Sequence, residues 1–286
     1  MTSDLTTPNA QQVEYWNSAV AQTWVRLQTR LDQLFQPLTQ VALESAAPQP
    51  GERAIDVGCG CGATVLELAR RLGPGGHVLG VDISEPMLDL ARRRIAEAGH
   101  TQATLVRADM STYAFAPHQS DLAFSRFGVM FFADPVAAFA NLRGALKSSG
   151  RLVFVCFRSL SENAWVREPL SAVKDLLPPS PSPGPEEPGQ FAFADPDRVR
   201  RILGEAGFHD ISLTRHDPVM QLAGPGAAGQ AAELSSQIGP IARALVGAPD
   251  TLRTAVRDAL AAAFRQYDGP DGIALSGANW IVAAKA

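Results

Sequence analysis

The sequence predicts an α/β fold, in which a doubly wound and mostly parallel sheet carries helices on both faces. From residue 53 onward, short unbroken apolar runs alternate with amphipathic stretches, as strands that are buried on both faces require. Helix-starting residues separate these runs, for example Ser84 before Pro86 and the pair Asp134-Pro135. Because parallel crossovers are right-handed, a doubly wound sheet is the simplest topology that connects such elements.

The elements follow from this alternation. The expected strands cover residues 53–57, 77–81, 103–107, 121–125, 152–157, 211–214 and 280–284. The expected helices cover residues 63–72, a stretch after Ser84, 134–147, 196–207 and 228–265. Residues 11–45 also space their apolar positions as a helix does. We expect Pro37 to kink or end a helix there.

A glycine-rich loop follows the first strand, in the run Asp56-Val57-Gly58-Cys59-Gly60-Cys61-Gly62. Alternate glycines let the backbone turn tightly and approach a ligand, and the loop ends at the N-terminus of a helix. Asp82 closes the second strand, where a carboxylate can accept hydrogen bonds from two ribose hydroxyls. The loop therefore predicts a cofactor that contains a nucleoside.

Two cofactor classes fit this loop. The spacing Gly58-x-Gly60-x-x-Ala63, with Asp82, also matches the dinucleotide fingerprint. Asp56, however, suits a cationic amine such as that of a methionine moiety and would repel a pyrophosphate. Ala108-Asp109-Met110 ends the third strand with a carboxylate suited to the amino group of adenine and an apolar neighbour. The chain also ends in a strand without a second nucleotide-binding half, which argues against a dinucleotide.

Together these residues resemble the class I S-adenosylmethionine-dependent methyltransferases, in the branch that includes ubiquinone and menaquinone biosynthesis enzymes. The resemblance covers about residues 50–160 and the last strand. It implies a Rossmann-like seven-stranded sheet of order 3-2-1-4-5-7-6 with an antiparallel strand 7, and S-adenosyl-L-methionine as cofactor. The residues predicted to bind the cofactor are Asp56, Gly58, Cys59, Gly60, Gly62, Asp82, Ile83, Met87, Ala108, Asp109, Met110, Ser125 and Arg126.

The resemblance also implies a division of the chain. We expect an N-terminal helical lid, the cofactor-binding core, a Pro-rich covering segment, a continuation of the core, a helical insertion and the last core strand. These parts cover residues 1–48, 49–158, 159–195, 196–217, 218–277 and 278–286. Tyr15, Trp16 and Trp24 are the aromatic residues of the predicted lid, and plain helix packing is the alternative for them.

No residue is identified as catalytic. Ligands bind beyond the carboxyl ends of the strands in such sheets, and Arg126 and His216 are the candidates that follow a strand. A salt bridge for Arg126 and a surface position for His216 are the alternatives. Methyl transfer from a sulfonium needs mainly in-line placement and exclusion of water. A missing catalytic side chain is therefore compatible with this activity.

Composition limits the partners. The net charge of −4 argues against a protein built to hold nucleic acid, and no apolar run is long enough to span a membrane. Three cysteines and a polar start without a signal sequence predict a cytoplasmic protein. Cys59 and Cys61 lack partner ligands nearby in the sequence, so no metal is expected. The apolar stripe of residues 218–277 suits core packing, a pocket roof or a homodimer contact.

The predicted function is metal-independent transfer of a methyl group to a small molecule whose nucleophilic atom is undetermined. The alternatives are a nicotinamide-dependent oxidoreductase, a methyltransferase that acts on a macromolecule, and a sensor that binds the cofactor without turnover.

Overall fold

The computed structural model describes residues 9–178, 184 and 186–286, and the chain forms two compact units. The first unit contains residues 1–156, 187–215 and 280–286. The second contains residues 157–186 and 216–279. The predicted division of the chain at residues 159 and 218 stays a prediction. No helix among the described residues is both long and apolar enough to cross a membrane.

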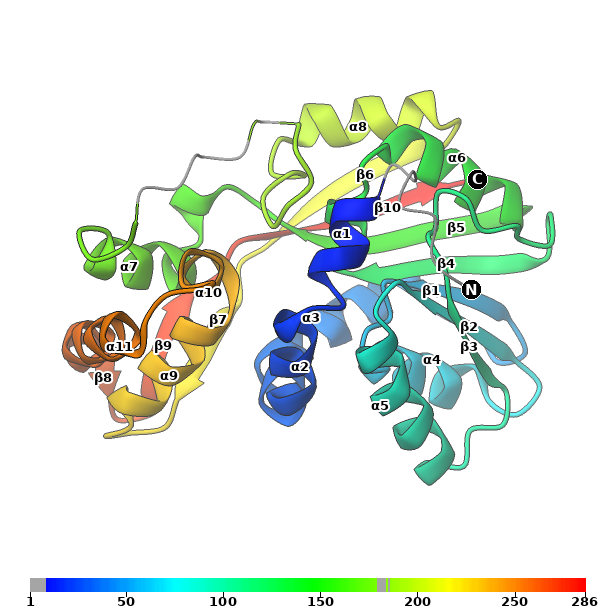
Figure 1. Ribbon diagram of the computed structural model, residues 1–286. Helices are drawn as coiled ribbons and strands as arrows, with labels where there is room; N and C mark the ends of the chain where they lie inside the picture. Colours follow the sequence, from blue (N-terminus) through cyan, green and yellow to red (C-terminus); the bar gives the residue numbers. More distant parts are fainter. Residues whose placement is uncertain (1–8, 179–183, 185) are drawn as a thin grey trace. The chain divides into compact units, whose positions relative to one another are not determined.

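A seven-stranded sheet has the order β3-β2-β1-β4-β5-β10-β6 (Figure 1). The strands are β1 (Arg53–Val57), β2 (His77–Asp82), β3 (Ala103–Arg107), β4 (Ser120–Arg126), β5 (Leu146–Phe157), β6 (His209–His216) and β10 (Asn279–Lys285). The last strand of the chain inserts between the fifth and the sixth. The order that the resemblance implied is thereby confirmed.

Strand direction in this sheet follows from pairing and hydrogen bonds. The pairs β1–β2, β2–β3, β1–β4 and β4–β5 are parallel. The amide of Arg158 donates to the carbonyl of Ala278, and the amide of Ala286 donates to that of Gly150. Residues with higher numbers on β5 therefore face residues with lower numbers on β10, so the two strands are antiparallel. The carboxyl ends of β1, β2, β4 and β5 consequently share one edge of the sheet.

The register between β10 and β6 follows from three contacts. Lys285 pairs with Asp210, the hydroxyl of Ser212 donates to the carbonyl of Ala283, and the guanidinium of Arg215 stacks over the ring of Trp280. Each contact fits the same antiparallel register. Thus β10 is antiparallel to both neighbours, and β6 again runs with the rest of the sheet.

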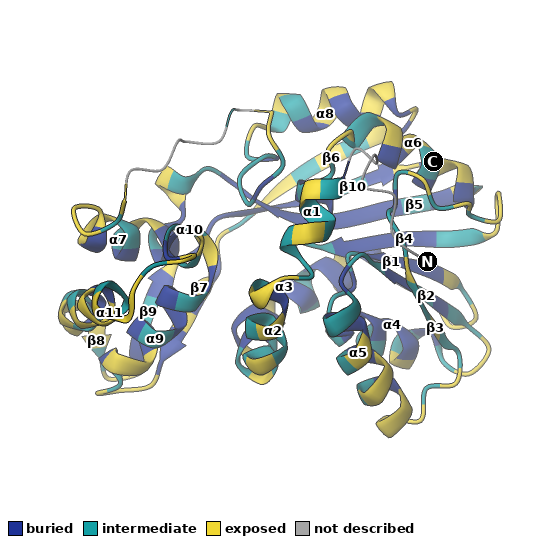
Figure 2. Cartoon of the chain, in the orientation of Figure 1, coloured by how far each residue is buried: buried dark blue, intermediate teal, exposed yellow. Residues whose placement is uncertain are grey.

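Helices cover both faces of this sheet, α4 and α5 on one and α6 and α8 on the other (Figure 1). Their bounds are α4 (Ala63–Leu72), α5 (Glu85–Glu97), α6 (Pro135–Ala145) and α8 (Pro196–Glu205). A buried stripe holds α4 on β1 and β2, formed by Val65, Leu68, Ala69 and Leu72. Strands β1, β4 and β5 are largely buried, whereas α5 and α8 expose one side (Figure 2). The core is therefore a sheet sandwiched between helices, as predicted.

The N-terminal helices are α1 (Ala10–Tyr15), α2 (Ala19–Arg26) and α3 (Gln28–Ala46). Pro37 lies inside α3 and does not end it, so the expectation that it ends a helix is wrong. Pro37 and Gln33, whose carbonyl loses its hydrogen bond, are both exposed, and water can satisfy that carbonyl. Buried Leu34 and Leu38 hold the helix on either side.

The boundary between α6 and β5 also differs from the prediction. The helix ends at Ala145 and the strand begins at Leu146, where a helix through Lys147 and a strand from residue 152 were expected. Amides of His118 and Gln119 donate to the carbonyls of Gly144 and Ala145. Pairing with the adjacent segment of the same chain, residues 118–120, therefore overrides the local helical preference. The register between β4 and β5 shifts between Ser120 and Leu122, and regular pairing follows.

Among its described residues, the second unit combines four α-helices with a three-stranded antiparallel sheet of order β7-β9-β8. Its elements are α7 (Ala164–Val173), β7 (Val219–Ala223), α9 (Ala228–Gln237), α10 (Gly239–Ala244), α11 (Asp250–Phe264), β8 (Asp268–Gly269) and β9 (Gly272–Ser276). The helical stretch of residues 228–265 is thus confirmed, with breaks, whereas α7 and the small sheet were not predicted. Most of the Pro-rich stretch, residues 179–183 and 185, lies outside the described residues.

Gly58 should be the most sensitive glycine of the cofactor loop. Its φ is +66° and an added Cβ would lie 2.7 Å from Gly128 Cα, whereas Gly99 has a φ of +71° with open space around it. We expect Gly99→Ala to lower the free energy of unfolding by about 1 kcal/mol through backbone strain alone. Gly58→Ala should cost more, because two backbones must also separate. Chemical denaturation of both variants measures the difference, and equal losses would contradict the close approach.

Candidate cofactor-binding site

The glycine loop connects β1 to α4 at the carboxyl edge of the sheet. Gly58, Gly60 and Gly62 all have positive φ, at +66°, +51° and +83°. A Cβ on Gly62 would lie 3.0 Å from that of Ala91 on α5, and one on Gly58 would collide with the turn after β4. Glycine is therefore required at these two positions by close neighbours and by backbone conformation. The loop is held between α5 and β4, as the predicted role demands.

Asp56 lies at the end of β1, directly before the loop, and is completely buried. Its Oδ2 accepts a hydrogen bond of 2.5 Å from the hydroxyl of Thr64. Its Oδ1 has no hydrogen-bond partner among the residues that the structure describes. Burial raises the pKa of Asp56 from 3.8 to about 7, although the Thr64 bond and the Arg126 charge act in the opposite direction. A buried carboxylate with one unpaired oxygen is costly unless a ligand completes it.

Asp82 ends β2 and faces the loop. Its Oδ2 accepts from the amide of Gly60 and its Oδ1 from the amide of Ser84, each at 2.8 Å. Burial raises the pKa of Asp82, and these backbone hydrogen bonds lower it. Each carboxylate oxygen has about two acceptor sites, so both oxygens keep one for a further donor. Two hydroxyls of one ribose would suit this arrangement.

Asp109 follows β3 and has one engaged and one unengaged oxygen. Its Oδ1 accepts from the side chain of Asn9 at 2.8 Å and from the amide and hydroxyl of Ser111 at 2.9 and 2.7 Å. Its Oδ2 is buried and without a partner in the described part of the chain. The next residue, Met110, is 5% exposed. An amino group beside an apolar surface, as on adenine, matches both features.

The predicted neighbours Ile83, Met87 and Ala108 lie between these carboxylates in the sequence, and Met87 packs against the loop. Met87 is buried with Cys61 and Ala21, and Trp16 and Trp24 pack against that cluster. The amide of Ala108 donates to the carbonyl of Asp82 at 3.0 Å, which ties the end of β3 to that of β2. The structure therefore brings the apolar and acidic candidates of β1, β2 and β3 to one edge.

Two asparagines anchor the N-terminal segment to this edge, and sequence reasoning missed both. Asn9 donates to Asp109 and accepts from the amide of Ala133 at 2.8 Å. Asn17 donates to the carbonyl of Ile83 at 3.0 Å and accepts from the amide of Glu85 at 3.0 Å. Each partner lies more than 60 residues away in sequence, so no local pattern could reveal these bonds.

Trp16 is the centre of an aromatic cluster. Its ring makes edge-to-face contacts with those of Tyr15, Trp24 and Phe131, at centroid distances of 5.2, 5.7 and 5.2 Å. Phe131 belongs to the 3₁₀ turn Val129–Phe131 that follows β4. The aromatic residues of the predicted lid therefore connect α1 and α2 to the loop after β4 and to the cofactor loop.

Ser125 and Arg126 end β4 with different surroundings. The hydroxyl of Ser125 donates to the carbonyl of Val57 at 2.7 Å and accepts from the amide of Gly128 at 3.2 Å, so it fixes the two loops to each other. Arg126 donates to the hydroxyl of Thr39 at 2.8 Å, and its guanidinium lies 5.6 Å from the ring centre of Phe35. Burial lowers the pKa of Arg126, with opposing effects of Asp32 and Asp56.

The remaining catalytic candidate, His216, lies in the second unit, as does Arg158. Arg158 follows β5, and its guanidinium pairs with Glu162 and with Asp217, the latter at 2.5 Å. Its guanidinium is thus nearly buried and paired with two carboxylates that are themselves exposed. His216 ends β6 and is half-buried.

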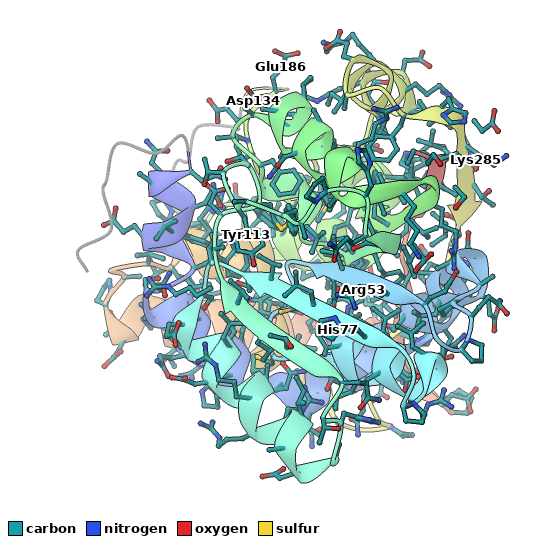
Figure 3. All side chains as sticks on the ribbon, turned by 90° about the vertical axis from the view of Figure 1, so that its right-hand side faces the viewer. Arg53, His77, Tyr113, Asp134, Glu186 and Lys285 are labelled. Atoms are coloured by element: carbon teal, nitrogen blue, oxygen red, sulfur yellow. The ribbon has the colours of Figure 1, made fainter. Side chains whose placement is uncertain are left out.

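A surface hollow lies at the opposite edge of the sheet and is a poor candidate. Arg53, His77 and Gln119 border it, with Phe115 at its side. Arg53 and His77 begin β1 and β2 and lie side by side (Figure 3). Ligands of such sheets bind at the carboxyl ends of the strands, which is the edge with Asp56, Asp82 and Asp109.

The residues present fit a sulfonium nucleoside. Asp56 and Asp109 each offer a buried, unpaired carboxylate oxygen, and Asp82 keeps free acceptor sites between them. Burial raises the pKa of Cys61 to about 12 and also raises that of Cys59. Both side chains are therefore uncharged thiols within the loop. Within the described residues, no three side chains of His, Cys, Asp or Glu gather as metal ligands would.

Comparison with known families and relatives agrees with this geometry. Residues 54–150 match a family described as "Methyltransferase domain". A nocamycin O-methyltransferase from Saccharothrix syringae is 31% identical over 205 residues, which are 68% of this chain and 72% of that protein. An aklanonic acid methyltransferase from a Streptomyces species is 33% identical over 43% of this chain and 56% of its own length. A demethylmenaquinone methyltransferase from Staphylococcus saprophyticus is 27% identical over 57% and 72%.

Solved structures show the same fold. The YcgJ protein from Bacillus subtilis has a TM-score of 0.57 at 14% identity, covering 86% of this chain and 97% of that one. Phosphoethanolamine N-methyltransferase 2 of Haemonchus contortus, in complex with S-adenosyl-L-methionine, has a TM-score of 0.55 at 18% identity, covering 99% and 58%. With the family match and the nocamycin relative, the comparisons support methyl transfer and not hydride transfer. The chain belongs to the class I S-adenosylmethionine-dependent methyltransferases, in the branch that includes enzymes of quinone biosynthesis.

Proposed function

We propose that this methyltransferase transfers a methyl group from S-adenosylmethionine to an oxygen atom of a small organic molecule, without a metal ion. The observation that supports this proposal most directly is the pair of buried, unpaired carboxylate oxygens on Asp56 and Asp109. The choice of oxygen is supported by a relative that is 31% identical over 72% of its own length and is an O-methyltransferase. When bound, the cofactor supplies a methyl group already activated on sulfur.

Three carboxylates would hold the cofactor. Asp56 accepts a hydrogen bond from the amine of the methionine portion, Asp82 accepts from the ribose hydroxyls, and Asp109 accepts from the amino group of adenine. The unpaired oxygens of Asp56 and Asp109 and the spare acceptor sites of Asp82 support these roles. Charge-assisted hydrogen bonds to a buried carboxylate are among the strongest. Of the three carboxylates, Asp56 would therefore contribute most to the binding free energy of the cofactor.

Arg126 would bind the carboxylate of the methionine portion. No acidic side chain lies within salt-bridge distance of its guanidinium among the described residues, and its one hydrogen-bond partner is the neutral hydroxyl of Thr39. Asp56 interacts with it electrostatically. A cation that burial penalises gains from a nearby anion. A ligand that carries an amine and a carboxylate would therefore complement Asp56 and Arg126 together.

The N-terminal segment would close over the cofactor. Asn9 binds the same carboxylate that would hold adenine, Asn17 binds the backbone on both sides of Ser84, and Trp16 packs near the loop. Such a cover excludes water from the reaction, which lets in-line placement provide most of the rate enhancement. No protein group needs to activate the donor.

The setting of the reaction is also a proposal. The three cysteines are buried and unpaired, which supports a reducing compartment such as the cytoplasm. The net charge of −4 supports a small acceptor rather than nucleic acid. A homodimer through the second unit stays a prediction.

Replacing Asp56 should weaken cofactor binding without unfolding the protein. Asp56→Asn removes the charge that would face the amine and should weaken S-adenosylhomocysteine binding by about 10- to 100-fold. Removing a buried, half-paired charge should leave the unfolding free energy unchanged or higher. Isothermal titration calorimetry measures the affinity, with Asp121→Asn at the opposite edge of the sheet as the control. Equal affinities of the two variants would contradict the role of Asp56.

Cofactor binding should strengthen as the pH rises toward neutrality. Burial holds the pKa of Asp56 at about 7, above the ordinary 3.8, so the free folded protein keeps this proton where the unfolded chain has lost it. The carboxyl therefore contributes stability that declines as pH rises through that window. An amine needs the ionised form, so binding below about pH 7 should release a proton. Titrations in buffers of different ionisation enthalpy count this proton; no proton release by the wild type would refute the assignment.

Asn17 should slow cofactor release. Asn17→Ala removes the bonds to Ile83 and Glu85 and should speed dissociation of S-adenosylhomocysteine about tenfold. Ser18→Ala removes the exposed N-cap of α2 and the hydroxyl's hydrogen bond to the carbonyl of Tyr15, but no bond to Ile83 or Glu85, and is the matched control. Stopped-flow displacement measures both rates. A segment that merely packs as a helix would give the same dissociation rate in both variants.

A further inference from the structure

The surface hollow at the amino-terminal edge of the sheet lies entirely within the first unit. Its volume is about 60 Å³, and since one water needs about 10–15 Å³, a group of several heavy atoms fits in it. The side chains that matter here are those of Arg53, His77, Leu79, Phe115, Gln119 and Ser120. The three carboxylates of the candidate cofactor site lie at the opposite edge, so the hollow is a separate place on the same unit.

The parallel pairing of β1 and β2 places two basic residues side by side at this edge. Arg53 is the register partner of His77, and Ile55 is that of Leu79. Register partners project from the same face of a sheet, as do alternate residues of one strand. One face therefore carries both basic side chains at its edge, with the two apolar ones further along the strands. Figure 3 shows Arg53 and His77 next to each other.

The guanidinium of Arg53 makes neither a hydrogen bond nor an ion pair with any residue that the structure describes. The acidic side chains near it have cations of their own. Glu52 pairs with Arg151 at 2.8 Å, and Asp121 pairs with Lys147 at 2.6 Å. Asp121 also accepts a hydrogen bond of 3.0 Å from the backbone amide of Arg53. The side-chain charge of Arg53 is therefore available to a ligand.

His77 adds a second basic group to the hollow. Its Nε2 lies 3.2 Å from the hydroxyl of Thr104, and its Nδ1 makes no hydrogen bond within the described residues. Burial and the charge of Arg53 lower the pKa of His77, so the imidazole and the guanidinium repel each other when both are charged. An anion beside them removes this repulsion and favours the protonated imidazole.

Neutral donors and an aromatic wall complete the hollow. In the described part of the chain, the side chains of Gln119 and Ser120 make no hydrogen bond, so an amide and a hydroxyl can donate to a ligand. The ring of Phe115 contacts that of Tyr113 edge-to-face, with a centroid distance of 4.6 Å. The side chain of Asn141 donates to the carbonyl of Tyr113 at 2.9 Å and so holds this loop in place.

This set of donors suits a phosphate group better than a carboxylate. A carboxylate offers two oxygens and one negative charge. A phosphate group offers three or more acceptor oxygens and about 1.5 to 2 negative charges near pH 7. Four side chains, two of them basic, match the larger anion, and the planar fork of an arginine fits its oxygens.

We propose that the hollow binds the phosphate group of a small phosphate ester, held by Arg53 and His77, with the apolar part of the ester against Phe115. Gln119 and Ser120 donate the remaining hydrogen bonds. The site binds its ligand without making or breaking a covalent bond. It does not rest on the proposed function, because all of its groups lie away from the candidate cofactor site.

Isothermal titration of the full chain with phenyl phosphate tests this site. Arg53→Gln should bind the probe at least about tenfold more weakly, because a charge-assisted hydrogen bond is lost. His77→Phe keeps a ring without its donors and should weaken binding by a similar factor. Arg70→Gln is the matched control, since Arg70 is an exposed arginine of α4 that pairs with Glu67. It changes the net charge equally and should bind the probe as the wild type does.

Inorganic phosphate and benzoate are the comparison probes. The wild type should bind both more weakly than phenyl phosphate, and Phe115→Ala should weaken only phenyl phosphate, by about two- to tenfold. Equal affinities for phenyl phosphate and inorganic phosphate would overturn the ester in favour of free phosphate. The site itself is overturned if Arg53→Gln and Arg70→Gln bind phenyl phosphate alike, if benzoate binds as tightly, or if S-adenosylhomocysteine displaces the probe.

Discussion

A single buried carboxylate constrains the cofactor edge of this protein. Asp56 ends the central strand β1 in complete burial, with one oxygen on Thr64 and the other unpaired. Gly58 and Gly62 in the loop that follows cannot carry side chains without striking the turn after β4 or α5. Under the proposed function, the amine of the cofactor completes this arrangement. The placement of Asp82 and Asp109 on the next two strands then extends the same site along the sheet edge.

Much of this edge could be predicted because its signals are local. A glycine loop after a strand, a carboxylate before it and another at the end of the next strand are visible as sequence spacing. The five strands from β1 to β5 follow from the alternation of apolar runs and amphipathic stretches, whereas the order of the sheet came from the family resemblance. The two errors, at Pro37 and at the start of β5, arose where tertiary contacts outweighed local preference. The helix tolerates Pro37 because the carbonyl that loses its hydrogen bond is exposed to water. The helix α6 ends earlier than predicted because the following residues pair with β4.

The features that sequence reasoning missed depend on distant partners. Asn9 and Asn17 reach residues of three different strand ends, and nothing in the polar N-terminal segment distinguishes them from solvent-exposed residues. Asn279 opens the apolar final strand, where its burial could not be foreseen. Strands β7 and β9 are short and contain glycine or mixed residues, so their period-two pattern is weak. Such elements form because they pair with each other.

The candidate cofactor site lies within the first unit, whose acidic groups would suit a cationic nucleoside. The relatives share methyl transfer, and their names differ in the acceptor. Fold likeness at 14–18% identity establishes the architecture alone and does not identify an acceptor.

A crystal structure of the complex with S-adenosylhomocysteine tests the central claim most directly. The account predicts the amine within hydrogen-bond distance of Asp56 Oδ1, the ribose hydroxyls on Asp82 and the adenine amino group on Asp109 Oδ2. A nucleoside bound away from the glycine loop, or one whose amine leaves Asp56 Oδ1 unpaired, would contradict it.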